Sequence, residues 1–229
     1  MSPDLFRVRQ MKVVRAAAAL VVAALGGAAM SGCTSAQQQG QSPAFLIVSA
    51  LNAAAGATPD QFGGVLASDV ITLVKIEGGG GGDGEEAPVT FAPTVFADNG
   101  EVNFVLAMKD PGSIDNPTQP SSQNFITVNR YHVVFVRADG RNTPGVDVPY
   151  PFDGGMTVTV GGNGGKGVFN LVRAQAKEEA PLRALRGTGA GGMISTIAEV
   201  TFYGFDQAGR EVSVKANIGV NFGDWGDPK

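Results

Sequence analysis

The stretch ISTIAEVTFYGFDQAGREVSVKANIGVNF, residues 194–222, decides the fold of this chain. Apolar or small side chains occupy every second position from Ile194 to Phe202, and the alternation resumes from Val212 to Phe222 after a turn over 206–209. A period of two gives each strand one buried face and one solvated face. Strands of this kind need a second sheet to cover their apolar side, so the pattern predicts an all-β sandwich.

Strand signals of the same kind precede this hairpin. Runs rich in β-branched or alternating apolar residues predict strands over 45–51, 65–76, 101–108, 126–136, 156–160 and 168–172. Glycine, proline and aspartate predict a turn over 98–100 and loops over 78–86, 110–123 and 137–155. Pro181 limits a helix over 174–186 to one or two turns. We therefore expect a single enlarged antiparallel β-sandwich of about eight or nine strands over 44–229.

The final hairpin, with its Asp-x-x-Gly turn, resembles the last two strands of immunoglobulin-like and fibronectin-type bacterial domains. The resemblance covers about residues 193–222 and implies an Ig-like sandwich. The chain departs from true immunoglobulin domains because it lacks their paired cysteines. Its only tryptophan, Trp225, follows the last predicted strand instead of lying between the sheets.

The N-terminus has the pattern of an export signal. Four basic residues are followed by an uncharged run, Ala16 to Met30, that is rich in alanine, valine and leucine; the basic residues are Arg7, Arg9, Lys12 and Arg15. A run of about 15 residues is short for a membrane-spanning helix and typical of the apolar core of a signal peptide. Residues 1–32 are therefore predicted to be a signal peptide, with Met11 as an alternative start.

The signal ends in Met30-Ser31-Gly32-Cys33, which resembles the lipobox of bacterial lipoproteins. The resemblance implies cleavage before Cys33, a thioether-linked diacylglycerol on its sulfur and an acylated amine. No aspartate follows Cys33, which is similar to enterobacterial lipoproteins sorted to the outer membrane. We expect lipid anchoring in a bacterial outer membrane, at its periplasmic face or at the cell surface. The alternative is that Cys33 is an ordinary small residue after an unrelated apolar helix.

Residues 34–43 are polar and uncharged, so we expect Cys33 and this segment to form a flexible tether. Without residues 1–32 the chain keeps 13 basic and 20 acidic residues, a formal charge of −7. An acidic chain without a basic cluster is a poor partner for nucleic acid. With 229 residues, 43% of them apolar, the chain is neither disordered nor collagen-like.

Composition also restricts the chemistry. One cysteine excludes a disulfide scaffold, and one histidine excludes sites built on several His or Cys ligands. That histidine, His132, lies in the most apolar predicted strand and is expected to be a half-buried strand residue. We therefore expect a non-enzymatic protein without a required cofactor.

The segment 137–153 is the candidate site. Its oxygen-bearing side chains could bind calcium: Asp139, Asn142, Asp147 and Asp153. The alternative is that they supply turns and loop-capping hydrogen bonds. Calcium is the one cofactor that the sequence suggests. The spacing of these four residues does not match an EF-hand loop.

Three aromatic residues are candidate contacts for a protein partner or a glycan: Tyr150, Phe152 and Trp225. Trp225 could instead fold back over the open end of the sandwich. The leading interpretation is a lipid-anchored envelope protein whose sandwich is a binding or structural module, with an envelope protein or glycan as partner. The alternative is a calcium- or carbohydrate-binding adhesive surface module. A hydrolase using carboxylates such as Asp139 and Asp153 is a third class.

Overall fold

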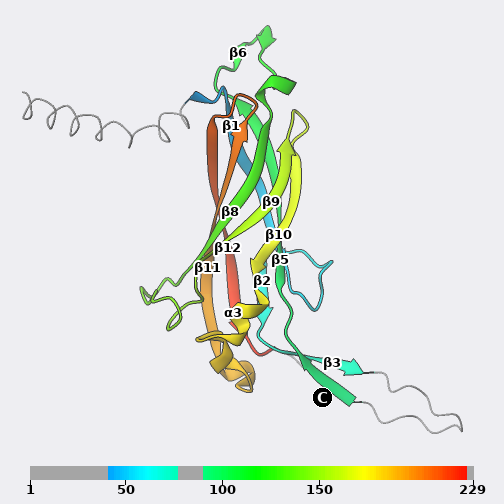
Figure 1. Cartoon of the computed structure of the whole chain (residues 1–229), viewed down its shortest axis with the longest axis vertical. Coiled ribbons are helices and arrows are strands. Elements are labelled where there is room, and N and C mark those ends of the chain that lie inside the picture. The colour runs from blue at the N-terminus through cyan, green and yellow to red at the C-terminus, as the bar shows by residue number, and fades with distance from the viewer. Residues whose placement is uncertain (1–40, 77–89, 226–229) are drawn as a thin grey trace, which may run out of the picture. The chain divides into compact units, whose positions relative to one another are not determined.

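Two β-sheets dominate the part of the chain that the structure, a computed structural model, describes, residues 41–76 and 90–225 (Figure 1). The three-stranded sheet has the order β1 (Ala44–Ala54), β5 (Asp98–Met108), β10 (Gly165–Val172). The five-stranded sheet has the order β2 (Val65–Asp69), β12 (Glu211–Gly223), β11 (Met193–Asp206), β8 (Ile126–Val136), β9 (Phe152–Val160). The predicted all-β, sandwich-like fold is confirmed.

The hairpin of β11 and β12 forms the centre of the five-stranded sheet. Its register runs without a break from Met193 opposite Gly223 to Phe205 opposite Glu211. The alternation seen in the sequence is the alternation of burial: every second residue of β11 is buried, and those between are exposed or partly exposed. The buried residues from Ile194 to Phe202 are Ile194, Thr196, Ala198, Val200 and Phe202. β8 pairs with the other edge of β11 and carries a second apolar row into the core.

Aromatic side chains from both sheets interlock in the core. Phe202 of β11 packs edge-on against Phe104 of β5 and Phe169 of β10, with ring centroids 5.1 and 5.3 Å apart. Tyr131 of β8 extends this row of aromatic rings, since its ring centroid lies 4.9 Å from that of Phe169. Edge-to-face contacts add to the hydrophobic burial of each ring, so this row holds the two sheets together. Phe169 also lies flat on its cross-strand partner Gly100, where a side chain would collide with the ring.

Smaller elements complete the described chain. Two short hairpins pair β3 (Thr72–Ile76) with β4 (Thr90–Thr94) and β6 (Gly112–Ser113) with β7 (Asn116–Pro117). The helical elements are α3 (Ala174–Glu178) and the 3-10 turns η1 (Ser122–Asn124), η2 (Leu182–Leu185) and η3 (Gly189–Gly191). The expected short helix over 174–186 is thus α3 followed by η2. Within residues 41–76 and 90–225, no helix has the length and apolar character needed to cross a bilayer.

Three local predictions are wrong. The run 65–76 is two strands, β2 and β3, because the Asp69 carboxylate accepts hydrogen bonds from the Ile71 N–H and the Thr72 hydroxyl and turns the chain. Asp98 begins strand β5 instead of a turn, because its carboxylate is buried against distant partners. The predicted loop over 137–155 ends at residue 151, since Phe152 already pairs with β8. The predicted loop over 78–86 lies outside the described residues.

One pairing also departs from the antiparallel expectation. β2 lies parallel to β12, with Val65 opposite Gly219 and Asp69 opposite Gly223. The two strands are far apart in sequence, so no hairpin connection forces them to be antiparallel. The predicted hairpin around 161–165 is present, with Gly161 bridged to Gly164, but its strands β9 and β10 belong to different sheets.

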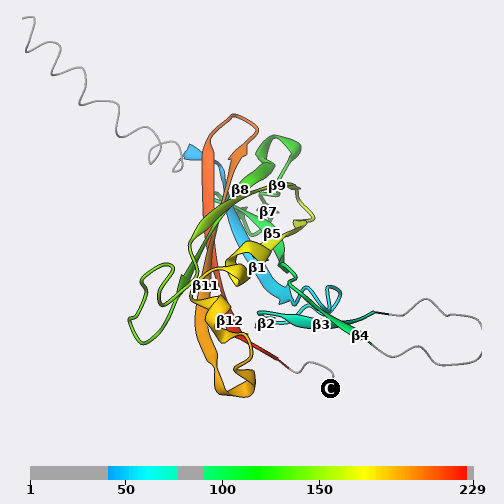
Figure 2. The same cartoon turned by 60° about the horizontal axis from the view of Figure 1, so that its bottom comes forward.

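The sandwich has two distinct ends. We call the end where β1 begins the tether end; there Pro43 lies near the β11–β12 turn, residues 206–210. We call the opposite end the pocket end; there β8 ends, α3 follows β10, and β3 and β4 project (Figures 1 and 2). The strands run between these two ends, and β11 alone, with 14 residues, spans about 45 Å.

Candidate functional site

The loop over 137–151, at the pocket end, is held by its own polar side chains. The Asn142 amide oxygen accepts from the Arg137 N–H at 2.7 Å, and the Asp147 carboxylate accepts from the Thr143 N–H at 3.2 Å. The Arg137 guanidinium donates to both oxygens of Asp139, at 3.1 and 2.6 Å. These contacts fold the loop back on itself, which gives its aromatic residue a defined position.

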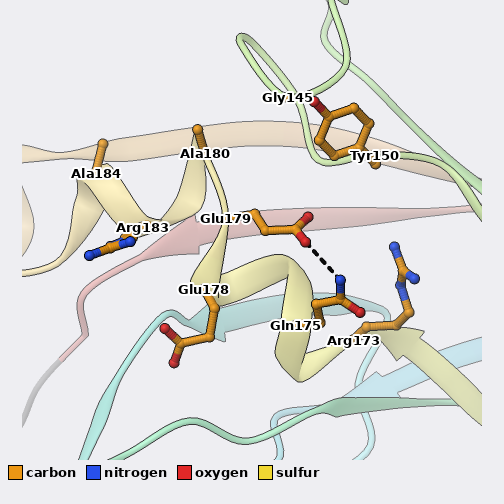
Figure 3. A pocket seen from close by; sticks show the side chains of 9 residues that line it. All are labelled: Gly145, Tyr150, Arg173, Gln175, Glu178, Glu179, Ala180, Arg183 and Ala184. Carbon is orange, nitrogen blue, oxygen red and sulfur yellow. Dashed lines mark hydrogen bonds between the residues drawn. The ribbon is translucent and has the colours of Figure 1, made fainter.

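Gly145 and Tyr150 shape the side of the loop that faces α3. Gly145 has a φ of +76°, a conformation that favours glycine, and its N–H donates to the Val148 carbonyl at 2.8 Å. Because Gly145 has no side chain, the Tyr150 ring lies against it, as Figure 3 shows. Val148 is buried in the core and fixes the loop from below, while Tyr150 remains 50% exposed.

A buried ion pair attaches α3 to the sandwich beneath the loop. Lys177 of α3 and Asp98 of β5 are each 1% exposed, and Lys177 Nζ lies 2.9 Å from Asp98 Oδ1 and 2.8 Å from Oδ2. The same carboxylate accepts from the Ser68 hydroxyl at 2.6 Å and from the Gly56 N–H at 2.8 Å. The Asp98 carboxylate of β5 therefore contacts three other elements: β2, α3 and the loop that follows β1. These contacts fix the position and orientation of α3 on the sandwich.

An open pocket of about 1010 Å³ lies between the loop and the helical segment (Figure 3). Its wall is formed on one side by Gly145 and Tyr150 and on the other by residues of the segment 173–184, namely Arg173, Gln175, Glu178, Glu179, Ala180, Arg183 and Ala184. Lys177 points inward to the core, so α3 presents its remaining polar side chains to the pocket. The pocket thus depends on both the loop and the ion pair for its shape.

The pocket combines an aromatic ring with balanced charge. The Gln175 amide donates to the Glu179 carboxylate at 2.7 Å, and the Arg173 guanidinium lies 4.5 Å from the centroid of the Phe152 ring. Arg173 Nε is buried and has no hydrogen-bond partner among the residues that the structure describes. Because the two arginines and two glutamates of the lining cancel in formal charge, the pocket favours neither an anion nor a cation.

A neighbouring arginine lowers the pKa of one pocket carboxylate, Glu178. The Arg186 guanidinium donates to Glu178 at 2.7 Å, and this hydrogen bond lowers the pKa of Glu178 below its ordinary value of 4.5. Arg186 also donates to the Lys177 carbonyl at 3.0 Å, so it braces the end of α3. Glu178 is therefore a permanent anion and hydrogen-bond acceptor at neutral pH, not a proton donor.

The structure does not gather the four predicted calcium ligands. Asp139 is held by Arg137 and Arg141, whose hydrogen bonds lower the pKa of its carboxyl well below the usual range, while Asn142 and Asp147 cap the loop. Asp153 lies in β9 and pairs with Arg130 at 3.2 Å. Across residues 41–76 and 90–225, no group of three His, Cys, Asp or Glu side chains is placed to hold a metal ion. Asp139, Asn142 and Asp147 make the loop contacts of the alternative, whereas Asp153 makes a cross-strand ion pair.

The three predicted aromatic contacts have different surroundings. Tyr150 is exposed and lines the pocket. Phe152 is 8% exposed and lies beneath Arg173, so it belongs to the core and supports the pocket from below. Trp225 folds back onto β2, where its indole Nε1 donates to the Ser68 carbonyl at 3.2 Å and its backbone N–H donates to Asp69 at 3.1 Å.

His132 is half-buried in β8, with a side chain 32% exposed, as expected for a strand residue. Its Nδ1 lies 3.3 Å from the Asp153 carboxylate, which Arg130 also contacts. The carboxylates named for a hydrolase, Asp139 and Asp153, are each engaged with separate arginines.

Sequence reasoning missed most of the pocket lining. Arg173, Glu178 and Glu179 lie in a segment recognised only as a short helix, and Lys177 reads in sequence as one more surface charge. A lysine one position before two glutamates offers no signal that its side chain is the one turned inward. Comparison with known protein families, with curated proteins and with solved structures finds no match for this chain.

Proposed function

We propose that this chain is a non-enzymatic, lipid-anchored envelope protein whose β-sandwich presents a binding site at the end remote from its anchor. The observation that carries the proposal is the position of the pocket. β1, which Cys33 and the tether precede in sequence, begins at one end of the sandwich, and the Tyr150 pocket lies at the other end. A site at that end is accessible to a partner that lies beyond the anchoring membrane.

The composition of the chain supports a binding role over catalysis. The chain has one histidine and one cysteine, and the cysteine is the predicted site of lipidation. His132 lies in the sheet beside Asp153 rather than in the pocket. The pocket carboxylate Glu178 has a lowered pKa, which suits hydrogen-bond acceptance and not proton donation.

The experiment that tests the proposal is protease digestion of intact cells, with lysed cells and a Cys33→Ala variant as controls. We expect wild-type protein in the membrane fraction and the Cys33→Ala variant in the soluble fraction. Digestion in intact cells indicates display at the cell surface, and protection until lysis indicates the periplasmic face. A Cys33→Ala variant that stays with the membrane contradicts the proposed anchor.

A glycan is the ligand class that the pocket favours. Sugar hydroxyls both donate and accept hydrogen bonds, and the pocket offers guanidinium donors, carboxylate acceptors and an amide that does both. The exposed ring of Tyr150 supplies an apolar face against which a sugar ring can pack. A lining whose formal charges cancel suits a neutral sugar better than an ion.

Retention on a panel of immobilised glycans, with calcium and with a chelator, tests this second candidate. Tyr150→Ala is expected to weaken retention about tenfold, as loss of a central aromatic contact does. The matched control is Tyr203→Ala, because Tyr203 lies in β11 under Arg130, whose guanidinium is 4.0 Å from its ring centroid. Equal retention of Tyr150→Ala and Tyr203→Ala contradicts a glycan site in this pocket.

A further inference from the structure

The outer face of the three-stranded sheet carries an exposed apolar patch at the tether end. Phe45 and Ile47 of β1 are 53% and 40% exposed, and Val105 of β5, the cross-strand partner of Ile47, is 38% exposed. Ala107 lies opposite Phe45 and continues the apolar surface. We call Phe45, Ile47 and Val105 the tether-end patch.

The patch is confined to one end of the sheet. Two residues further along β5, the outer face becomes polar at Asn103, whose carbonyl accepts from the Ser49 hydroxyl. Beyond it, Glu101 forms an ion pair with Lys166 of β10 at 2.7 Å. Away from the tether, adjacent exposed apolar side chains on this face thus give way to polar ones, and Val168, opposite Glu101 and 55% exposed, is an isolated apolar residue there.

From this placement, and resting on the proposed lipid anchor, we propose that the tether-end patch contacts the surface of the bilayer in which Cys33 is anchored. Cys33 lies eleven positions before Ala44, so the tether reaches about 40 Å when fully extended. If residues 34–43 form a flexible tether, as their sequence predicts, its average span is about 18 Å. Phe45 and Ile47 are the first large exposed apolar residues after the tether in sequence, and Ile114 of the β6–β7 hairpin, which follows β5 at the same end, is also exposed.

Tethering makes a weak contact effective. A module on a short flexible linker experiences its partner at an effective concentration of about millimolar. An interfacial contact by three apolar side chains therefore needs only a weak intrinsic affinity to be occupied for much of the time. The ammonium of Lys109 lies 5.1 Å from the centroid of the Phe45 ring, which places a cation beside the apolar surface, a combination that suits the headgroup region.

The unusual cysteine content of the chain allows a direct test. Cys33 is the only cysteine, and lipidation converts its thiol into a thioether that cannot react with a thiol-specific dye. A cysteine introduced elsewhere is then the sole labelling site in the mature lipoprotein. We would label Ile47→Cys with an environment-sensitive fluorophore in lipoprotein purified from membranes. The labelled protein is reconstituted in vesicles of phosphatidylethanolamine and phosphatidylglycerol that contain a nitroxide-labelled phospholipid.

Met193→Cys is the matched control. Met193 is 57% exposed, comparable to Phe45, and it begins β11 at the pocket end. We expect nitroxide lipid to quench the Ile47→Cys probe about twofold, as for a group at the headgroup boundary, and to leave the Met193→Cys probe unchanged. Phe45→Cys gives a second, independent reading, and the far-ultraviolet circular dichroism of each variant establishes that it folds.

The outcomes separate the patch from the anchor. Labelling of the wild-type protein at Cys33 contradicts the lipid anchor, and the inference fails with it. An unlabelled wild type with an unquenched Ile47→Cys probe leaves the anchor standing and overturns the inference. A blue-shifted probe without quenching means that protein covers the patch, and equal quenching at Met193→Cys means that the domain lies along the membrane; both results overturn it.

Discussion

Replacing Lys177 by methionine removes the cation of the buried ion pair and leaves the Asp98 carboxylate inside the protein. Methionine retains most of the apolar stem, so the main change is the loss of the ammonium group. Asp98 keeps the Ser68 hydroxyl and the Gly56 N–H but loses both contacts with Nζ. Removing one member of a buried pair costs about 3–5 kcal/mol. A domain of this size loses about 2–4 °C of Tm per kcal/mol, so we expect Tm to fall by roughly 6–20 °C.

The measurement is urea unfolding in a Cys33→Ala background, followed by fluorescence and by far-ultraviolet circular dichroism. Trp225 is the only tryptophan, and its indole donates to the Ser68 carbonyl beside the buried pair, so its emission reports on this region. Coincident transitions by the two probes establish that a single free energy of unfolding is being compared.

Two further variants serve as controls for the buried pair. Lys215→Met removes the cation of an exposed pair, Lys215 with Glu199 at 3.2 Å, and should cost less than about 1 kcal/mol. Lys177→Met combined with Asp98→Asn leaves no buried charge at this position, and should be more stable than the two single changes predict by at least about 1 kcal/mol. A cost of Lys177→Met no greater than that of Lys215→Met, or additive effects of Lys177→Met and Asp98→Asn, would contradict a stabilising role of the buried pair.

Three other predictions concern pH and packing. Burial raises the pKa of Tyr131 above its ordinary value of 10.0, so the stability it contributes is present below that pH and is lost as pH rises through the folded pKa; Tyr131→Phe should flatten the alkaline fall in Tm. Arg186 lowers the pKa of Glu178, so its contribution is present above pH 4.5 and is lost as pH falls through the folded pKa. The gap in urea midpoint between wild type and Arg186→Gln should narrow in acid, whereas a constant gap contradicts the pairing. Gly100→Ala forces its cross-strand phenyl ring to move and should cost about 1–3 kcal/mol in urea unfolding, while the same change at Gly155, which has open space, should be nearly neutral.

The parts of the fold that were predictable are those encoded locally. The strands from Ile194 to Phe222 follow from alternation over a few residues, and the register of their hairpin follows from the short turn between them. The shortness of the helix that begins at Ala174 was predictable because Pro181 interrupts the segment. The turn predicted at Asp98 was wrong, although residues 98–100 favour a turn in isolation. Its buried partner lies 79 positions away, and that contact decides the conformation.

The candidate site was only partly predictable for the same reason. Tyr150 was identified because an aromatic residue on a proline-rich loop is a recognisable local feature. The opposite wall of the pocket, Arg173 to Arg183, comes from a segment whose orientation is set by a single buried lysine. Asp139 and Asp147 were predicted as calcium ligands from their residue type, whereas in the structure their carboxylates accept hydrogen bonds from an arginine side chain and the backbone of the same loop.

The pairing of β1 with β5 has a mechanical consequence. The ladder is antiparallel from Ala44 opposite Met108 to Ala54 opposite Asn99, so it runs along most of the sandwich. A force applied at Ala44 along the strand, and opposed by a partner held at the far end, loads these rungs together in shear. A pull across the strand would instead break them one after another. A domain that is pulled by the first residue of a long edge strand therefore resists mechanical unfolding, because many backbone hydrogen bonds must break together. Its lifetime under force is set by the rate of that unfolding step.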